Sequence, residues 1–97
     1  MSIKTIQSVA LKGIWERDDL SALPNTYRYQ VRDILFDLDA AYTISDLEDI
    51  GAIQYNTENL DCWSVVVTVN GVEPCCAVIC DFWQGDCYNI DLREYEP

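Results

Sequence analysis

Residues 62–94 read CWSVVVTVNGVEPCCAVICDFWQGDCYNIDLRE, and the pattern of this stretch indicates the fold class. Apolar side chains alternate with other side chains in three runs, which is the period of a half-buried strand. Glycine-containing sequences typical of tight turns separate the runs, so each strand is expected to pair antiparallel with the next. The predicted strands are residues 62–69, 75–83 and 87–94, with turns at Asn70-Gly71 and Gln84-Gly85-Asp86 and a short further strand at 52–55.

The same alternation predicts which side chains share a face of the sheet. Because adjacent residues of a strand point to opposite faces, the neighbouring Cys75 and Cys76 are not expected to form a joint site. The residues expected on one face are Trp63, Val65, Val67 and Val69 in the first run, and Tyr88, Ile90 and Leu92 in the last.

Before residue 52 the apolar side chains recur at helical spacing. Ser8 is a suitable cap for a first helix, and Pro24 stands at the start of a longer one. Helices that precede an antiparallel sheet and cover one of its faces form an α+β fold. We therefore expect a single domain, residues 1–97, in which two N-terminal helices pack on a twisted antiparallel β-sheet. The elements expected before the sheet are a strand at 3–7, a helix at 9–16, a helix from Pro24 to Ala41 and one further turn at 45–49.

The charge of the chain is unusually one-sided. Its 17 acidic and 6 basic residues give a net charge of -11, and no Lys or Arg occurs from Asp33 to Leu92. Since 49% of the residues are hydrophobic, the chain is expected to fold and not to be disordered. Unpaired carboxylates crowded on a small surface cost stability through mutual repulsion, so we expect this acidic surface to be functional. Its natural partner is a strongly basic surface.

The composition argues against several kinds of active site. The chain has no histidine, which rules out nucleophiles activated by histidine and weakens the case for a zinc site. Glu94 and Glu96 are two residues apart and are interpreted as exposed carboxylates, not as a catalytic acid and base. We therefore expect no catalytic residue, no cofactor and no metal site. The residues expected to be buried thiols are Cys62, Cys75, Cys76, Cys80 and Cys87.

The sequence contains no segment typical of export or membrane insertion. Its first residues lack an apolar signal core, and no apolar run approaches the ~20 residues of a membrane helix. We therefore expect a cytoplasmic protein without a membrane partner.

Short motifs follow a recognisable order along nearly the whole chain. They are Ile3-Lys4-Thr5-Ile6, Ala10-Leu11-Lys12, Leu38-Asp39-Ala40-Ala41, Thr43, Asp46-Leu47, Gly51, Trp63-Ser64-Val65, Val69-Asn70-Gly71, Gly85-Asp86 and Tyr95. Apart from an insertion of about three residues around Val72 to Pro74, this order resembles the HigB branch of the RelE-like toxins. The resemblance implies their α+β fold. Those toxins are small ribosome-dependent endoribonucleases that hold RNA phosphates with basic side chains.

The sequence departs from that family at positions where the toxins carry a cation or an imidazole. Their Leu-Lys-Gly corresponds here to Tyr55-Asn56-Thr57, followed by Glu58, and their Trp-Arg-Ile corresponds to Cys76-Ala77-Val78. Their terminal Asp-Tyr-His corresponds to Glu94-Tyr95-Glu96-Pro97. Binding of a polyanion depends on Lys and Arg, and phosphoryl transfer needs positive charge, so we do not expect nuclease activity.

A charge-inverted scaffold of this kind is similar to phage anti-CRISPR proteins that imitate double-stranded DNA and inhibit the type I-F surveillance complex. That resemblance implies a stoichiometric inhibitor in the cytoplasm of the host bacterium, which uses no cofactor and does not itself bind nucleic acid. Such a protein would occupy the basic DNA-binding surface of the Cas8 and Cas5 subunits and exclude target DNA. The residues implied in partner binding are Asp33, Asp37, Asp39, Asp46, Glu48, Asp49, Asp91, Glu94 and Glu96, with Tyr29 and Phe36 as aromatic anchors.

The spacing of the carboxylates is compatible with this imitation. Asp33 and Asp37, four residues apart on a helix, lie about 6 Å apart, and Glu94 and Glu96 on a strand about 6.5 to 7 Å apart. Successive phosphates of a DNA strand rise ~3.4 Å along the axis and are roughly twice that apart through space. Any acidic surface contains such pairs, so the spacing supports DNA mimicry without specifying it.

Four alternatives stay open at this point. The acidic surface can be a solvated face of a protein from a salt-loving organism. A catalytically dead toxin fold can act as a decoy that binds an antitoxin. A residual RelE-like ribonuclease can use Tyr95 with backbone donors. Finally, Tyr29 and Phe36 can pack on the first helix near Ile14 and Trp15 instead of anchoring a partner.

Overall fold

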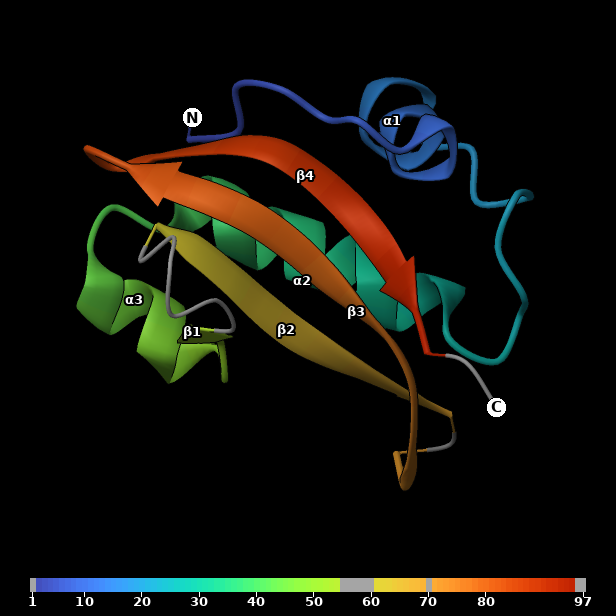
Figure 1. Ribbon diagram of the computed structural model, residues 1–97. Coiled ribbons are helices and arrows are strands. Elements are labelled where there is room, and N and C mark those ends of the chain that lie inside the picture. The colour runs from blue at the N-terminus through green and yellow to red at the C-terminus, as the bar shows by residue number, and fades with distance from the viewer. Residues whose placement is uncertain (1, 55–60, 70, 96–97) are drawn as a thin grey trace.

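The helices of the described residues precede the strands, as the sequence predicts. The computed structural model describes residues 2–54, 61–69 and 71–95 (Figure 1). Within these ranges lie three helices and a four-stranded antiparallel sheet, an α+β architecture. The elements are α1 (Val9–Arg17), α2 (Arg28–Ala40), α3 (Ile44–Asp49), β1 (Ile53–Gln54), β2 (Cys62–Val69), β3 (Glu73–Trp83) and β4 (Asp86–Glu94). Tyr55 of the predicted strand 52–55 and Asn70 of the predicted turn lie outside the described residues.

The sheet has the strand order β1-β2-β3-β4, and every neighbouring pair is antiparallel. It arches over α2, while α1 lies beyond the β4 edge and α3 lies near β1 (Figure 1). Gln84 and Gly85 both have positive φ, 51° and 83°, as the tight turn of a β-hairpin requires. The predicted turn at this position is therefore confirmed, although Asp86 already belongs to β4.

The core lies between α2 and one face of the sheet. The prediction that Trp63, Val65 and Val67 share a buried face is confirmed. Each large apolar side chain that leaves water contributes about 1.5–3 kcal/mol, so this layer supplies most of the favourable free energy of folding. The core residues of α2 are Val31, Ile34, Leu35 and Leu38, and those facing them on the later strands include Cys76, Val78, Cys80, Phe82 and Ile90.

Part of the predicted face pattern is wrong in β4. In β2, Val69 is half-buried and lies outside the core, after the point where the pairing with β3 shifts. In β4, Asn89 adopts a φ of 54°, in the left-handed region that Asn tolerates. This residue sits where β4 shifts against β3, so Ile90 is buried while Tyr88 does not join it in the core. Such bulges add one residue and redirect the side chains that follow.

The helix boundaries differ from the prediction in one important place. Ser8 caps α1 as expected, because its Oγ accepts a hydrogen bond of 3.2 Å from the Leu11 N–H. However, α2 begins at Arg28 and not at Pro24, because residues 25–27 form a turn. Both Tyr27 and Arg28 donate their N–H groups to the Pro24 carbonyl in that turn. The further turn predicted at 45–49 is a complete short helix, α3, so the described residues contain three helices instead of two.

The predicted strand at 3–7 is wrong. Only two isolated parallel bridges connect this segment to β4, from Ile3 to Cys87 and from Ile6 to Ile90. The bulge at Asn89 lies between the two bridges, and its N–H bonds to the Thr5 hydroxyl at 2.7 Å instead of to a backbone carbonyl. The backbone pairing between residues 3–7 and β4 is therefore interrupted at its middle, and no continuous strand forms there.

The cysteines depart from the prediction in two respects. None of the five forms a disulfide within the described residues, and all are buried except Cys75, which is half-buried. The expectation that Cys75 and Cys76 point apart is wrong, since their Sγ atoms lie 3.5 Å from each other. Cys75 is the extra residue of the bulge between Val67 and Thr68, and a bulge breaks the alternation of faces.

None of the helices in the described part of the chain is long and apolar enough to span a membrane.

Candidate partner-binding surface

The outer side of α2 presents two carboxylates to solvent. Asp33 and Asp37 are both exposed, and no cation of residues 2–54, 61–69 or 71–95 forms an ion pair with either. Like charges four residues apart on a helix repel each other. Asp37 also lies in the last turn of α2, which contains no basic residue and where the helix dipole is negative. Both effects lower the stability of α2, so these two acids do not stabilise the helix that carries them.

The structure brings carboxylates from two helices to one hollow. Asp37 from the end of α2 and Asp46 and Asp49 from α3 line a shallow cavity of about 220 Å³, with Ala40, Ala41 and Ile50 as its apolar lining. These acids are separated by up to 12 positions in the sequence, and sequence reasoning did not predict that they meet. A planar guanidinium can donate hydrogen bonds to several carboxylate oxygens at once, so this hollow is chemically suited to an arginine side chain.

Asp46 also fixes the position of α3. Its Oδ2 accepts hydrogen bonds from the Tyr42 N–H at 2.8 Å and the Thr43 N–H at 3.1 Å, and the Thr43 hydroxyl accepts one from the Asp46 N–H in return. This capping box satisfies the free N–H groups at the start of α3. The two backbone hydrogen bonds hold the pKa of Asp46 below its ordinary value of 3.8, so it remains ionised at neutral pH.

The lowered pKa of Asp46 predicts part of the acid sensitivity of the protein. A depressed carboxyl pKa contributes stability above its unfolded value of 3.8, and this contribution is lost as the pH falls through the lower folded value. In Asp46→Asn we expect a smaller loss of stability below pH 3.8 than in the unmodified protein, measured by urea unfolding between pH 2 and pH 7. Asp33→Asn is the matched control, because Asp33 is not part of a capping box. Parallel acid profiles for the unmodified protein and Asp46→Asn would contradict this role.

The other predicted acids divide into separate groups. Glu48 and Asp49 are exposed on α3, close to the hollow. Asp39 is half-buried and accepts a 3.2 Å hydrogen bond from the Ile3 N–H, so it holds the N-terminal segment. Asp91 and Glu94 belong to β4, and Glu96 lies outside the described residues.

Glu94 lies near the beginning of α2, far from the hollow. Burial raises the pKa of Tyr27, and the thiols of Cys76 and Cys75 and the carboxylate of Glu94 act in the same direction. A helix of 13 residues is about 20 Å long, so the two ends of α2 carry distinct acidic groups. Asp91 is paired with Ile79 across the sheet, on the face away from α2. The structure therefore does not gather all the predicted contacts in one place.

The two predicted anchors each have a partner within the protein. Phe36 packs edge-on against Trp15, with ring centroids 5.6 Å apart, as the packing alternative expects. Tyr29 lies beneath the guanidinium of Arg32, 5.2 Å from its ring centroid. Both rings nevertheless remain more than half exposed, Phe36 at 56% and Tyr29 at 51%. Each can contact a partner without being released from its internal contact.

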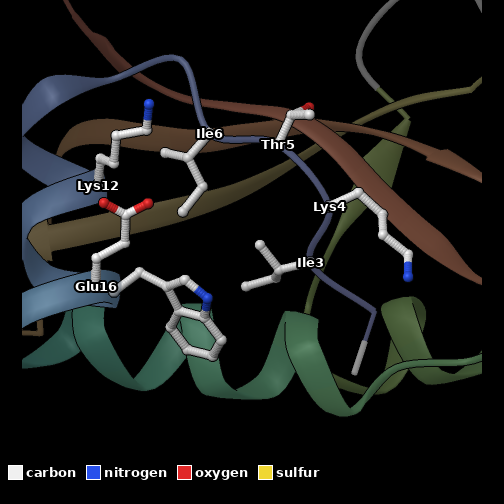
Figure 2. A pocket seen from close by; sticks show the side chains of 7 residues that line it. Ile3, Lys4, Thr5, Ile6, Lys12 and Glu16 are labelled. Atoms are coloured by element: carbon white, nitrogen blue, oxygen red, sulfur yellow. The ribbon is translucent and has the colours of Figure 1, made fainter.

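Sequence reasoning missed a cavity at the N-terminal segment. Its volume is about 440 Å³, and it lies between that segment and α1. Figure 2 shows Lys12 and Glu16 side by side on α1, with Lys4 on the opposite strand-like segment. Lys4 also forms a long ion pair of 3.9 Å with Asp86. Most of the Lys and Arg residues lie in the first third of the chain, and this pattern indicates that the side formed by the N-terminal segment and α1 is less acidic.

The face of the sheet opposite α2 carries a further hollow, which the alternation of apolar residues along the strands does not indicate. A hollow of about 260 Å³ lies there, lined by Ser64, Ala77, Arg93 and Tyr95 among others. Ile53 at 58% and Tyr95 at 44% are exposed at this hollow. Among the residues that the structure describes, no three cysteine or carboxylate side chains come close enough to hold a metal ion. Neither a family model nor a curated protein matches this sequence.

Proposed function

We propose that this protein is a DNA mimic that inhibits the type I-F CRISPR surveillance complex as an anti-CRISPR protein. It binds the basic DNA-binding surface of the Cas8 and Cas5 subunits in the bacterial cytoplasm and prevents double-stranded target DNA from binding. The inhibition is stoichiometric and involves no catalysis. The choice of this complex rests on the sequence resemblance, whereas the preference for a basic surface rests on the observations below.

One observation carries the proposal: Asp33, Asp37 and Asp49 are exposed, Asp46 lies half-buried beside them, and no ion pair within the described residues neutralises their charge. Asp37, Asp46 and Asp49 surround one hollow, and Asp33 extends the acidic surface along α2. Holding like charges together costs free energy in the isolated protein. A basic partner removes that repulsion, so the acidic surface gains more from binding than an ordinary solvated face does.

The proposed scaffold is the RelE-like toxin fold with its charge inverted. Helices followed by an antiparallel sheet support this assignment at the level of architecture. At the position of the toxins' strand arginine stands Ala77, which is buried on the second face of the sheet. Arg93 and Tyr95 share that hollow, and Tyr95 is the residue on which a residual ribonuclease would depend, together with backbone donors. A hollow with so little positive charge provides poor stabilisation for RNA phosphates.

The proposal predicts competition with DNA that weakens with salt. Purified type I-F surveillance complex is mixed with a protospacer-containing duplex, with and without this protein, and each mixture is analysed by gel shift and gel filtration. We expect co-elution of the protein with the complex and loss of duplex binding. Co-elution should decrease as the salt concentration rises, because exposed charges are screened beyond ~8 Å at physiological ionic strength.

Absence of co-elution together with intact duplex binding would refute the proposal. In that case, capture of the protein by a RelE-type antitoxin would support the decoy function. Cleavage of translated messenger RNA that disappears in Tyr95→Phe would instead support the ribonuclease.

A further inference from the structure

Two adjacent cysteines form an unexpected pair at the bulge of β3. The Sγ atoms of Cys75 and Cys76 lie 3.5 Å apart, although neighbouring side chains of a regular strand point to opposite faces. The register explains this proximity. Val67 pairs with Cys76 and Thr68 pairs with Pro74, so Cys75 is left without a partner residue on β2 and its side chain is redirected.

The two thiols differ in access. Cys75 is half-buried, and its Sγ donates a hydrogen bond of 3.4 Å to the Val67 carbonyl. Cys76 is only 1% exposed, and burial together with Cys75 raises its pKa to about 12. Cys76 is therefore a neutral thiol at physiological pH. A reagent that joins both sulfurs must first meet Cys75 and must provide a leaving group that accepts the proton of each thiol.

The geometry disfavours the two commonest reactions of a cysteine pair. Consecutive Cα atoms are ~3.8 Å apart, which is shorter than the ~4.4 Å minimum of ordinary disulfides. Direct oxidation would therefore produce a strained ring. A structural zinc ion requires four ligands, and the described residues provide no group of three cysteine or carboxylate ligands here or elsewhere.

An atom inserted between the sulfurs avoids both problems. A centre that binds two sulfurs at ~2.3 Å each, as zinc does, separates them by roughly 3.8 Å at the tetrahedral angle. The smaller bond angle at trivalent arsenic brings the sulfurs closer than that, toward the 3.5 Å found here. An arsenical with one organic substituent needs only two further bonds, and this pair can form both.

We propose that Cys75 and Cys76 are a dithiol site for monosubstituted trivalent arsenicals. The arsenic atom carries one organic group and two hydroxyl groups before the reaction. Each thiol forms one As–S bond and transfers its proton to a departing hydroxyl, so two As–O bonds break and two water molecules leave. No electron is transferred, and no oxidant is needed. Cys75 reacts first because it is the accessible thiol, and Cys76 then closes the ring.

The other cysteines of the protein are all buried, and Cys62, at 7% exposed, has no neighbouring cysteine in the sequence with which to close a two-sulfur ring. Cys80 and Cys87 lie on neighbouring strands and also interact with each other, but they are only 3% and 0% exposed. The hydrogen bond with Cys87 and burial raise the pKa of Cys80. Both side chains belong to the core, which a reagent reaches only after unfolding.

The test uses phenylarsine oxide, which forms the required dihydroxy species in water, and the folded full-length protein. We expect intact-mass spectrometry to show one adduct per chain with loss of two waters, stable to excess monothiol and removed by ethanedithiol. Cys75→Ser should abolish the stable adduct, while the control Cys80→Ala should retain it. Circular dichroism during labelling confirms that each variant is folded.

Three results would overturn the proposal: no adduct on the unmodified protein, an adduct that monothiol displaces, or a stable adduct on Cys75→Ser. Cys75→Ala provides a second variant in which no hydroxyl replaces the thiol, and it should also fail to form the adduct. The site is independent of the proposed inhibition of DNA binding, so either conclusion can fail without the other.

Discussion

Replacement of both Asp33 and Asp37 by lysine is expected to weaken binding to the type I-F surveillance complex by at least about 100-fold. Close charge pairs at protein interfaces contribute about 1.5 kcal/mol or more each, and about 1.4 kcal/mol corresponds to a tenfold change in affinity. Reversal removes two attractive pairs and introduces repulsion against a basic partner. The affinity is measured by titration of labelled protein, and DNA exclusion is measured in the same series.

The matched control reverses two acids outside the proposed surface. Glu16 on α1 and Glu73 at the start of β3 are both exposed, so their conversion to lysine changes the net charge by the same amount. We expect this control to bind within a few-fold of the unmodified protein at physiological salt. Equal losses in the two double variants would show that overall charge, and not the α2 surface, determines binding.

The same Asp33→Lys, Asp37→Lys variant should not be less stable than the unmodified protein. Two lysines four residues apart repel each other as two acids do, but the replacement lowers the net negative charge of the protein and removes a carboxylate from the negative end of α2. Lysine near the end of a helix is favourable to the dipole. Loss of binding together with unchanged or increased resistance to urea would separate a contact surface from a structural role.

Much of the fold follows from patterns that are local in the sequence. Ser8 caps α1 because its hydroxyl is placed one residue before the helix, and the paired Gln84 and Gly85 mark a tight hairpin turn. The face carrying Trp63 and Val67 follows from the period of two in β2. These features depend on residue type and spacing alone, so the sequence is sufficient to predict them.

The errors lie where one extra residue changes the register. The hydrophobic pattern does not indicate that Cys75 is excluded from pairing or that Asn89 takes a left-handed conformation. Pro74 carries no N–H for the ladder, and proline in a strand is typical of edges and bulges. That residue was therefore an available signal for the first bulge. The extra residue at Asn89 changes the alternation within β4, so Tyr88 before the bulge does not share the core face with Ile90 after it.

The hollow on the candidate surface depends on the angle between two helices. The charges of Asp37, Asp46 and Asp49 are evident in the sequence, whereas their meeting at one hollow depends on how α3 follows α2. The hydrogen bonds from the Tyr42 and Thr43 N–H groups to Asp46 fix the start of α3 directly after α2. Because one of the three acids also forms the capping box, the same residue both shapes the surface and contributes to its charge.

Replacement of the adjacent α2 residues Leu35 and Phe36 by alanine is expected to lower the free energy of unfolding by very different amounts. Leu35 is fully buried between α2 and the sheet, and its replacement by alanine should cost about 2.7–5.0 kcal/mol through lost burial and a remaining cavity. Phe36 is 56% exposed, and Phe36→Ala should cost roughly 0.5–1.5 kcal/mol through loss of its contact with Trp15. Urea unfolding measures both values under the same conditions.

The two variants should also separate folding from binding. At temperatures where each remains folded, Leu35→Ala should retain its affinity for the surveillance complex, because its side chain does not reach the surface. Phe36→Ala should bind more weakly if the exposed half of the ring is an anchor, since aromatic side chains at interfaces carry a large share of the binding energy. Similar stability losses for the two substitutions would contradict the orientation of α2 described above. Unchanged affinity of Phe36→Ala would leave its ring as a packing element of α1 and assign recognition to the carboxylates alone.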